Sequence, residues 1–119
     1  MTGWRKKQIA NLMFNKHQYV RSQKLLKAVA KLDCQCCGAG GPTQAAHSNW
    51  GGGKGKGIKA DDNLTAALCL KCHYEIDQGK NLSKEERQEK WLKAHKNTVA
   101  LLLVRGEWPS GVPVPEWDA

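Results

Sequence analysis

The sequence predicts a small α+β fold, and three observations support that prediction. The chain has 119 residues, which suits a single small domain. Hydrophobic residues recur at helical spacing towards both ends, whereas residues 33–82 hold two short apolar segments around a glycine-rich loop. This centre has few large side chains to bury, and it carries two clusters of cysteines that can supply a metal staple.

The N-terminal quarter, residues 1–32, is expected to form a basic helical arm. Over residues 20–32, Leu25 and Val29 recur on one side of a helix and lysines fill the other. Residues 4–14 show a weaker form of the same pattern. The arm has eight Lys and Arg residues and no Asp or Glu, so the net charge of +8 resides there. Such a segment is either a solvated helix surface or a binding site for a polyanion.

The central segment, residues 33–82, predicts two short strands and a helix. Residues 43–48 and 64–68 are the expected strands, pairing back across the glycine-rich loop between them. A short helix is expected to begin at the second cysteine cluster and to end near Gly79.

The C-terminal part predicts one long helix over residues 83–106, followed by an extended tail over residues 107–119. Ser83 and Glu86 fit a capping box, and Gly106 fits the left-handed residue that follows a helix. The residues of this helix expected to face the core are Trp91, Leu92, His95, Val99, Leu102 and Leu103.

The composition favours a cytoplasmic protein without a membrane span. No apolar run approaches the roughly 20 residues that cross a bilayer. The first residues lack the apolar segment of a secretory signal, and five cysteines are an odd number for complete disulfide pairing. These features predict cysteines that bind metal rather than one another.

Four cysteines are the predicted ligands of a structural zinc ion. Cys34 with Cys37 and Cys69 with Cys72 form two Cys-x-x-Cys pairs separated by 31 residues. Each short turn can aim two sulfurs at one point. The alternative is that one pair consists of incidental buried thiols. Cys36 is expected to be a free thiol, because its bite with Cys34 is too tight for a zinc knuckle.

A second metal site is predicted beside the zinc pair. His73 follows the last cysteine directly and Asp77 lies four residues later, so both share one face of the expected helix. Their nitrogen and oxygen donors are harder than thiolates, and two protein ligands leave positions open for a reactive metal. Alternatively, His73 is a spare zinc ligand or a surface residue. His47 is expected to lie over His73, because the chain returns there through a strand, a loop, a strand and a helix.

These motifs together match a known pattern. The residues that carry the likeness are Ala46, His47, Lys59, Asp61, Leu68, Cys69, Cys72, His73, Glu75, Ile76 and Asp77. Over residues 33–80 the chain resembles the HNH endonucleases, also called ββα-metal or His-Me finger nucleases. The likeness is strongest to a small phage-type subgroup that includes a RecA-dependent nuclease and short prophage nucleases. It implies a zinc-stapled ββα-metal (HNH) core flanked by the N-terminal and C-terminal helices.

Carried over by position, the resemblance implies a mechanism for phosphodiester hydrolysis. His47 would be the general base that activates water, a role that suits a side chain with a pKa of about 6.5. His73 and Asp77 would hold one divalent ion, Mg²⁺ or Mn²⁺, which neutralises charge in the transition state.

Two departures from the family pattern leave catalytic roles open. Ala46 stands where the pattern often has a metal-binding side chain, so that place falls to Asp61, to a water molecule or to His47 itself. Asn63 is one residue further from the cysteine pair than the commonest spacing, and it either orients His47 or caps a turn. Asp61 likewise is either a site residue or a turn residue.

The predicted function is a metal-dependent DNA endonuclease of low sequence specificity, because no base-reading helix can be named. The resemblance implies single- or double-stranded DNA as the partner, in a bacterial cytoplasm and from a host or phage gene; it leaves open a recombinase filament. One alternative is a non-catalytic zinc-dependent nucleic-acid-binding module, which Ala46 favours. Another is a zinc-stabilised adaptor that binds protein through Trp108 and Trp117. The predicted DNA contacts are Lys54, Lys56 and Lys59 of the glycine-rich loop and Arg5, Lys6, Lys7, Lys24 and Lys27 of the arm.

Overall fold

A computed structural model describes residues 19–48 and 61–117, and this part of the chain has an α+β fold with three helices and one two-stranded sheet. The elements are α2 (Gln23–Ala30), β1 (Gln44–His47), β2 (Thr65–Leu68), α3 (Leu70–Gln78) and α4 (Lys84–Val104). The expected helix at residues 4–14 and the glycine-rich loop lie outside the described residues. Within the described ranges, no helix combines the length and the apolar character needed to cross a membrane.

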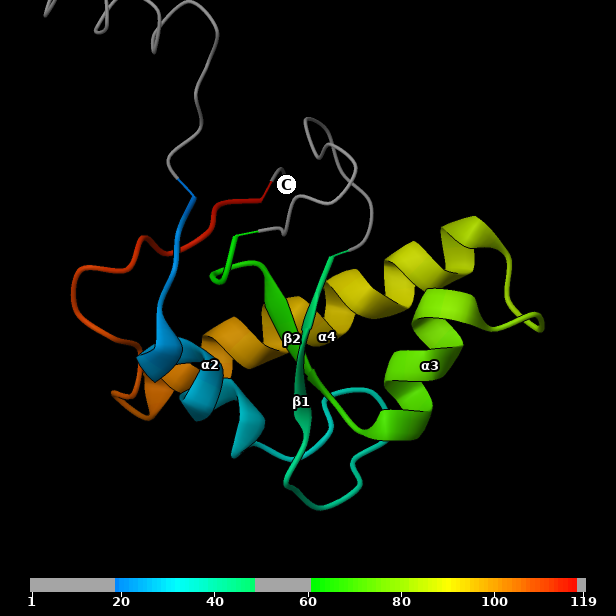
Figure 1. The fold of residues 1–119 in the computed structure, drawn as a ribbon, viewed down its shortest axis with the longest axis horizontal. Helices are drawn as coiled ribbons and strands as arrows, with labels where there is room; N and C mark the ends of the chain where they lie inside the picture. The colour runs from blue at the N-terminus through cyan, green and yellow to red at the C-terminus, as the bar shows by residue number, and fades with distance from the viewer. Residues whose placement is uncertain (1–18, 49–60, 118–119) are drawn as a thin grey trace, which may run out of the picture.

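The two strands lie at the centre of the molecule in Figure 1. They pair antiparallel, with His47 opposite Thr65. The middle positions of both strands are alanines, whose small side chains let helices approach closely. Because side chains alternate along a strand, one pair of alanines faces each side of the sheet. These pairs are Ala46 with Ala66 and Ala45 with Ala67.

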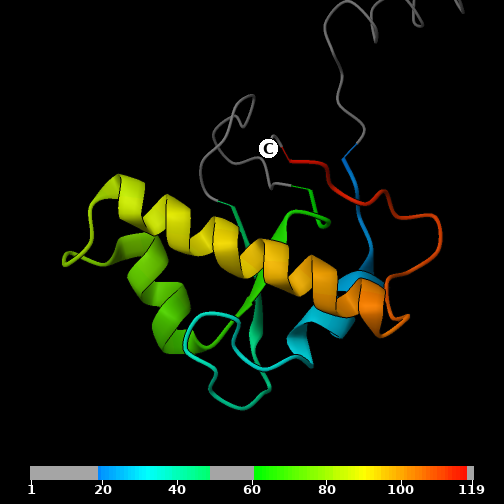
Figure 2. The same ribbon diagram turned by 180° about the vertical axis from the view of Figure 1, so that it is seen from behind.

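Each side of the sheet is covered by its own apolar core, and Figure 1 shows α2 and α3 on opposite sides of the strands. We call the two sides the α3 face and the α2 face. The core of the α3 face contains Cys34, Ala46, Ala66, Leu68, Cys72, Ile76, Trp91 and Ala94. The core of the α2 face contains Leu25, Val29, Leu32, Ala67 and Leu102. The helix α4 contributes to both cores because it crosses the strands, from the side of α3 to the side of α2 (Figure 2).

Side chains of α4 also satisfy backbone groups of β2. The Ala67 N–H donates to the Thr98 hydroxyl oxygen at 3.0 Å, and Nδ1–H of His95 donates to the Thr65 carbonyl at 2.8 Å. The Thr98 hydroxyl in turn donates to the Ala94 carbonyl at 2.8 Å. The helix therefore occupies a strand edge that would otherwise leave polar groups unpaired.

The predicted helix within residues 20–32 is confirmed, and it is an integral part of the fold. Ser22 is the N-cap of α2, and its hydroxyl oxygen accepts the Leu25 N–H at 3.1 Å. Leu25 and Val29 are buried against the sheet, while Lys24 and Lys27 are exposed on the outer side. Residues 20–32 therefore do not belong to a separate basic arm, and residues 1–18 of the predicted arm lie outside the described residues.

The predicted signals at both ends of α4 are confirmed. The Ser83 hydroxyl oxygen accepts the Glu86 N–H, and the Glu86 carboxylate accepts the Ser83 N–H. Gly106 has a φ of +69°, the left-handed conformation expected after a helix. The predicted buried stripe was partly wrong, because Leu92 and Leu103 are 38% and 45% exposed. Ala94 and Thr98 are buried instead, because they lie on the side of α4 that meets β2, where the Thr98 hydroxyl oxygen accepts the Ala67 N–H.

Candidate functional site

The sulfur atoms of Cys34, Cys37, Cys69 and Cys72 converge, and all four lie within 4.8 Å of one another. The Sγ atoms of Cys37 and Cys69 are 3.7 Å apart. Four thiolates about 2.3 Å from a tetrahedral zinc ion are separated by about 3.8 Å. The cluster therefore has the donors and the spacing to hold a zinc ion. In the part of the chain that the structure describes, it is the only group of three or more potential metal ligands.

The two cysteine turns share one local geometry. The Cys37 N–H points at Sγ of Cys34 and the Cys72 N–H points at Sγ of Cys69, each at 3.4 Å. Cys69 is also the N-cap of α3, so the end of β2 and the start of the helix position the second pair. Cys36 is exposed and is not part of the cluster, as predicted.

The electrostatics of the cluster favour a bound cation. Burial raises the pKa of the Cys34 thiol, but backbone N–H groups from the two turns outweigh it and lower that pKa to about 6. Burial raises the pKa of Cys72, and the neighbouring thiols raise it further. One sulfur therefore ionises readily, whereas full deprotonation of the set needs compensating positive charge. A divalent metal ion supplies that charge, and soft thiolates suit zinc.

His73 and Asp77 form a pair on the exposed side of α3. Nε2 of His73 lies 3.1 Å from Oδ2 of Asp77, and Nδ1 of His73 lies 2.6 Å from Oε1 of Gln44 on β1. An amide oxygen only accepts, so Nδ1–H donates to it, and Nε2 meets the carboxylate either as a second N–H donor or, as a lone pair, across a shared cation. Two acceptors that face each other suit a shared cation or a proton. The pair borders a hollow of about 250 Å³ that also contacts Leu70 and Tyr74.

His47 ends β1 and pairs with a carboxylate that the sequence motifs do not single out. Its Nε2 lies 2.9 Å from Oδ1 of Asp62. The Asp62 side chain is 7% exposed, whereas the His47 side chain is 26% exposed and reaches solvent. Asp62 lies between Asp61 and Asn63, the two predicted site residues of this turn. The sequence alone does not show which of these three consecutive polar residues contacts His47.

The two predicted residues, Asp61 and Asn63, make their own contacts. Oδ1 of Asp61 accepts the Val20 N–H at 3.0 Å, and Nδ2 of Asn63 donates to the Pro113 carbonyl at 3.0 Å. Both contacts join the turn before β2 to distant parts of the chain. The catalytic roles assigned to Asp61 and Asn63 stay predictions, and the carboxylate on His47 belongs to their neighbour.

The structure does not bring His47 over His73. Gln44 and His47 are three residues apart on β1, so their side chains leave opposite faces of the sheet. Gln44 contacts His73 on the α3 face, whereas His47 lies on the α2 face with Asp62. The path of the backbone predicted that His47 lies over His73, but the alternation of side chains along β1 places His47 on the other face. The fold therefore holds two separate histidine–aspartate pairs.

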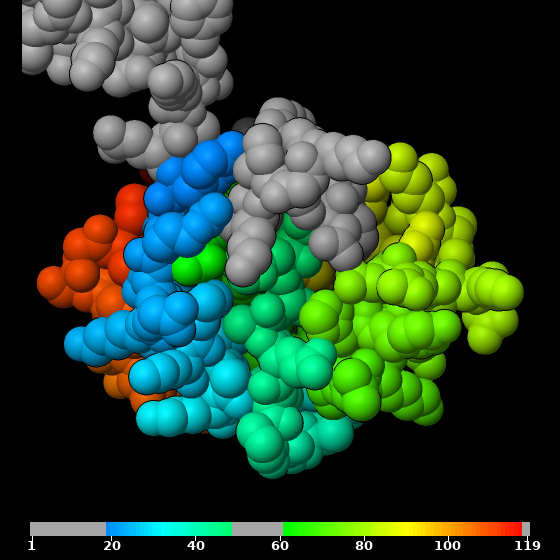
Figure 3. Space-filling view, viewed as in Figure 1, coloured from blue at the N-terminus to red at the C-terminus, as the bar shows by residue number. Residues whose placement is uncertain are grey.

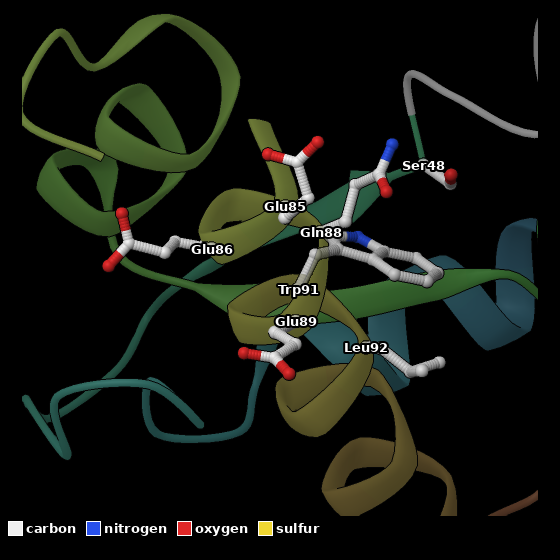
Figure 4. A pocket seen from close by; sticks show the side chains of 7 residues that line it. All are labelled: Ser48, Glu85, Glu86, Gln88, Glu89, Trp91 and Leu92. Carbon is white, nitrogen blue, oxygen red and sulfur yellow. The ribbon is translucent and has the colours of Figure 1, made fainter. Parts of the chain in front are cut away.

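A hollow of about 540 Å³ lies beside Ser48, the residue after His47 (Figure 4). Glu85, Glu86 and Glu89, from the start of α4, line it together with Trp91, and the Glu86 carboxylate points away from the indole. The indole is held in place, because its Nε1–H donates to the Ala46 carbonyl at 3.0 Å. Negative charge of this density disfavours phosphate, so DNA is not expected to bind here.

The predicted phosphate contacts divide between described and undescribed residues. Lys24 and Lys27 are exposed on α2, which forms one flank of the surface in Figure 3, with β1 between it and α3. Arg21 is exposed one residue before the N-cap of α2. The predicted contacts outside the described residues are Arg5, Lys6, Lys7, Lys54, Lys56 and Lys59.

Comparison of the chain with protein-family models, with curated proteins and with solved structures gave no match. The class that the geometry defines is a small α+β protein with a four-cysteine cluster that can bind zinc. The likeness to HNH endonucleases stays a hypothesis that rests on the motifs quoted above.

Proposed function

We propose that the protein is a metal-dependent HNH-type endonuclease that cleaves DNA with low sequence specificity. The observation that carries the proposal is the order of the strands, the cysteine cluster and the helix along the chain, and the residues at the end of each. The strand β1 ends in a carboxylate-paired histidine, and β2 leads through a zinc-binding cysteine straight into α3. The helix α3 then presents His73 and Asp77 one turn apart. This is the arrangement of residue types that the resemblance implies.

In the proposed reaction, neutral His47 takes a proton from a water molecule. The water oxygen forms a bond to phosphorus, the bond from phosphorus to the 3′ oxygen breaks, and solvent protonates that oxygen. A divalent ion, Mg²⁺ or Mn²⁺, held by His73 and Asp77 would neutralise charge on a phosphate. The two pairs lie on opposite faces of the sheet, so in this arrangement they do not meet the same phosphate, and the roles of the base and of the metal are separate parts of the proposal with separate tests.

The exposed basic residues of α2 support DNA as the partner. Ser22, the N-cap of α2, donates its N–H to Asp62, the residue that contacts His47. Backbone phosphates bound by Lys24 and Lys27 would therefore lie on the face of the sheet that carries the proposed base. A recombinase filament as a second partner, and action in a bacterial cytoplasm by a host- or phage-encoded protein, belong to the same proposal and rest on the resemblance alone.

The test is a cleavage assay with purified, zinc-loaded protein on single- and double-stranded DNA, with Mg²⁺, with Mn²⁺ or with EDTA. We expect cleavage with one of the metals and none with EDTA. His47→Ala should lower kcat by about 10²–10⁴-fold, because a base acts in the transition state, and should preserve zinc content and DNA affinity. Full activity of this variant contradicts the mechanism.

The metal role has its own variants. His73→Ala and Asp77→Ala should raise the concentration of Mg²⁺ or Mn²⁺ needed for half-maximal cleavage, with activity partly recovered at high metal. The control is Tyr74→Ala, which removes an exposed residue of the same helix that has no part in the proposed ligand set. An unchanged metal requirement in His73→Ala would remove this pair from the reaction.

A second candidate function is a non-catalytic zinc-dependent nucleic-acid-binding module. Two observations favour it: among the described residues, no third His, Cys, Asp or Glu side chain groups with His73 and Asp77, and His47 lies on the opposite face. This candidate predicts salt-dependent DNA binding without cleavage in any of the metal conditions.

A further inference from the structure

We infer that Asp62 is the positioning residue of His47 and holds its ring in the tautomer that leaves Nδ1 free to accept a proton. The inference rests on the proposed role of His47 as a base. Oδ1 of Asp62 lies 2.9 Å from Nε2 of His47. An ionised carboxylate only accepts hydrogen bonds, so the ring nitrogen that faces it must carry the hydrogen. In the neutral ring, Nδ1 then holds the lone pair.

The carboxylate of Asp62 is held from its other side as well. Its Oδ2 accepts the Ser22 N–H at 2.8 Å, so each oxygen has its own donor. The backbone of Asp62 is fixed too, because its N–H donates to the Val20 carbonyl at 2.9 Å. A side chain that is 7% exposed and bonded at both oxygens cannot swing away from the ring.

A base must reach water, whereas the residue that positions it can be buried, and the two side chains of this pair differ in exposure in that way. Asp62 is buried, whereas His47 is 26% exposed, so the ring can meet water and the carboxylate behind it cannot. A purely structural pair needs no exposed ring. The contact from Ser22 also connects the pair to the start of α2, so the basic surface proposed to bind DNA begins beside the proposed base.

The decisive variant is Asp62→Asn, which keeps the size of the side chain. The Ser22 N–H requires an acceptor, so the amide oxygen stays on that side and the NH₂ group turns to His47. An NH₂ group donates, so Nε2 must become the acceptor and the hydrogen must move to Nδ1. Nitrogen NMR of labelled histidine separates protonated from unprotonated ring nitrogens, and the His47 signal is the one absent from His47→Ala.

At a pH where the nitrogen signals show a neutral ring, we expect hydrogen on Nε2 in the natural protein and on Nδ1 in Asp62→Asn. Asp62→Ala, which offers the ring no partner, should give a mixture of both tautomers. Hydrogen that stays on Nε2 in Asp62→Asn overturns the inference. This measurement does not need cleavage activity, so it separates failure of the positioning role from failure of the proposed function.

The kinetic test uses the same variants under the metal condition that supports cleavage. Asp62→Asn should lower kcat by about 10²–10⁴-fold with little change in KM, because its Nδ1 can no longer accept a proton. The double variant His47→Ala with Asp62→Asn should be no slower than His47→Ala alone. Full activity of Asp62→Asn beside an inactive His47→Ala would show that the contact does not serve the base.

Thr65→Val is the matched control. It removes the hydroxyl bond to the Asp62 carbonyl but leaves the carboxylate and its contact with His47 in place. We expect the natural tautomer and an unchanged kcat in this variant, with zinc content confirming the fold. A shift of the tautomer in Thr65→Val equal to that in Asp62→Asn would assign the effect to the turn rather than to the carboxylate.

Discussion

Both faces of the sheet carry a histidine–aspartate pair, and the two pairs are positioned by different kinds of interaction. On the α3 face, His73 and Asp77 lie one turn apart on a single helix whose N-cap is a cysteine of the cluster. On the α2 face, His47 meets Asp62, which is held by the backbone at Ser22, 40 positions away in the chain. A short motif therefore specifies the first pair, whereas the second exists only because the fold brings distant segments together.

The two faces also differ in what stabilises them. The core of the α3 face includes two cysteines of the four-sulfur cluster, and a zinc ion can join the turns that carry those sulfurs. The α2 face is held by aliphatic side chains of α2 and α4. Removal of the metal and truncation of an apolar side chain should thus affect the two faces unequally.

The largest effect is expected from the cysteine cluster. Changing Cys34, Cys37, Cys69 or Cys72 to Ser should release zinc and unfold the α3 face, because structural zinc can contribute about 10 kcal/mol or more of folding free energy. Metal analysis and circular dichroism measure both results. Cys36→Ser is the control and should retain zinc, since this thiol is exposed and outside the cluster. Loss of zinc from Cys36→Ser with its retention in Cys34→Ser would refute the ligand assignment.

A smaller effect is expected on the α2 face. Leu25 is fully buried between α2 and the sheet, so Leu25→Ala should lower the free energy of unfolding by about 2–5 kcal/mol. Urea unfolding of the zinc-loaded protein measures this change. The folded fraction should still bind zinc, because no sulfur ligand lies in this core. The exposed neighbour Lys24→Ala serves as the control and should unfold almost like the natural protein.

The pH dependence of stability should sharpen the comparison further. His95 is fully buried and stacks on Trp91 with ring centroids 4.7 Å apart, and burial lowers its pKa. Below about pH 6.5, His95 binds a proton in the unfolded chain but less readily in the folded protein, so the free energy of unfolding should fall as the pH drops. Urea unfolding at about pH 7.5 and about pH 5.5 measures the loss.

His95→Gln isolates that contribution. Both proteins lose zinc affinity as acid protonates the thiolates, so the quantity to compare is the difference between their pH dependences. The loss of stability below about pH 6.5 should be smaller in His95→Gln, since glutamine does not titrate. Equal pH dependences would show that another group is responsible.

The smallest structural effect is expected at the surface of α2. Changing Lys24 and Lys27 to Glu should leave the fold and the zinc content intact, because both side chains are exposed. If they bind DNA phosphates, the slope of log K against log [salt] should flatten by about 0.9 for each phosphate of duplex DNA that is no longer bound. Matched changes of Lys84 and Lys90 on α4, which border the acidic end of that helix, should not alter the slope. An unchanged slope in the α2 variant would make that face a solvated surface.

Much of the fold and part of the site were predictable because they depend on neighbours in the sequence. The periodic positions of α2, the capping box at Ser83 and the left-handed Gly106 are all found where the sequence predicts them. The two sulfurs of each pair converge because a tight turn is enough, whereas the two pairs, 31 residues apart, meet through the fold. Leu92 and Leu103 are exposed although the sequence predicts them to face the core, because helical periodicity does not show which side of α4 packs against β2.

The sequence by itself thus determined the elements, their ends and the four cysteines of the cluster that can bind zinc, since short-range sterics and hydrogen bonds decide these. Tertiary structure alone decided which of three consecutive polar residues meets His47: Asp61 turns to Val20, Asn63 to Pro113, and Asp62 to the ring. It also separated His47 from His73, because each residue along a strand reverses the face to which a side chain points. The partner of His47 and its separation from His73 depend on which surfaces of the sheet the helices cover. Packing between residues far apart in the chain decides which surfaces those are.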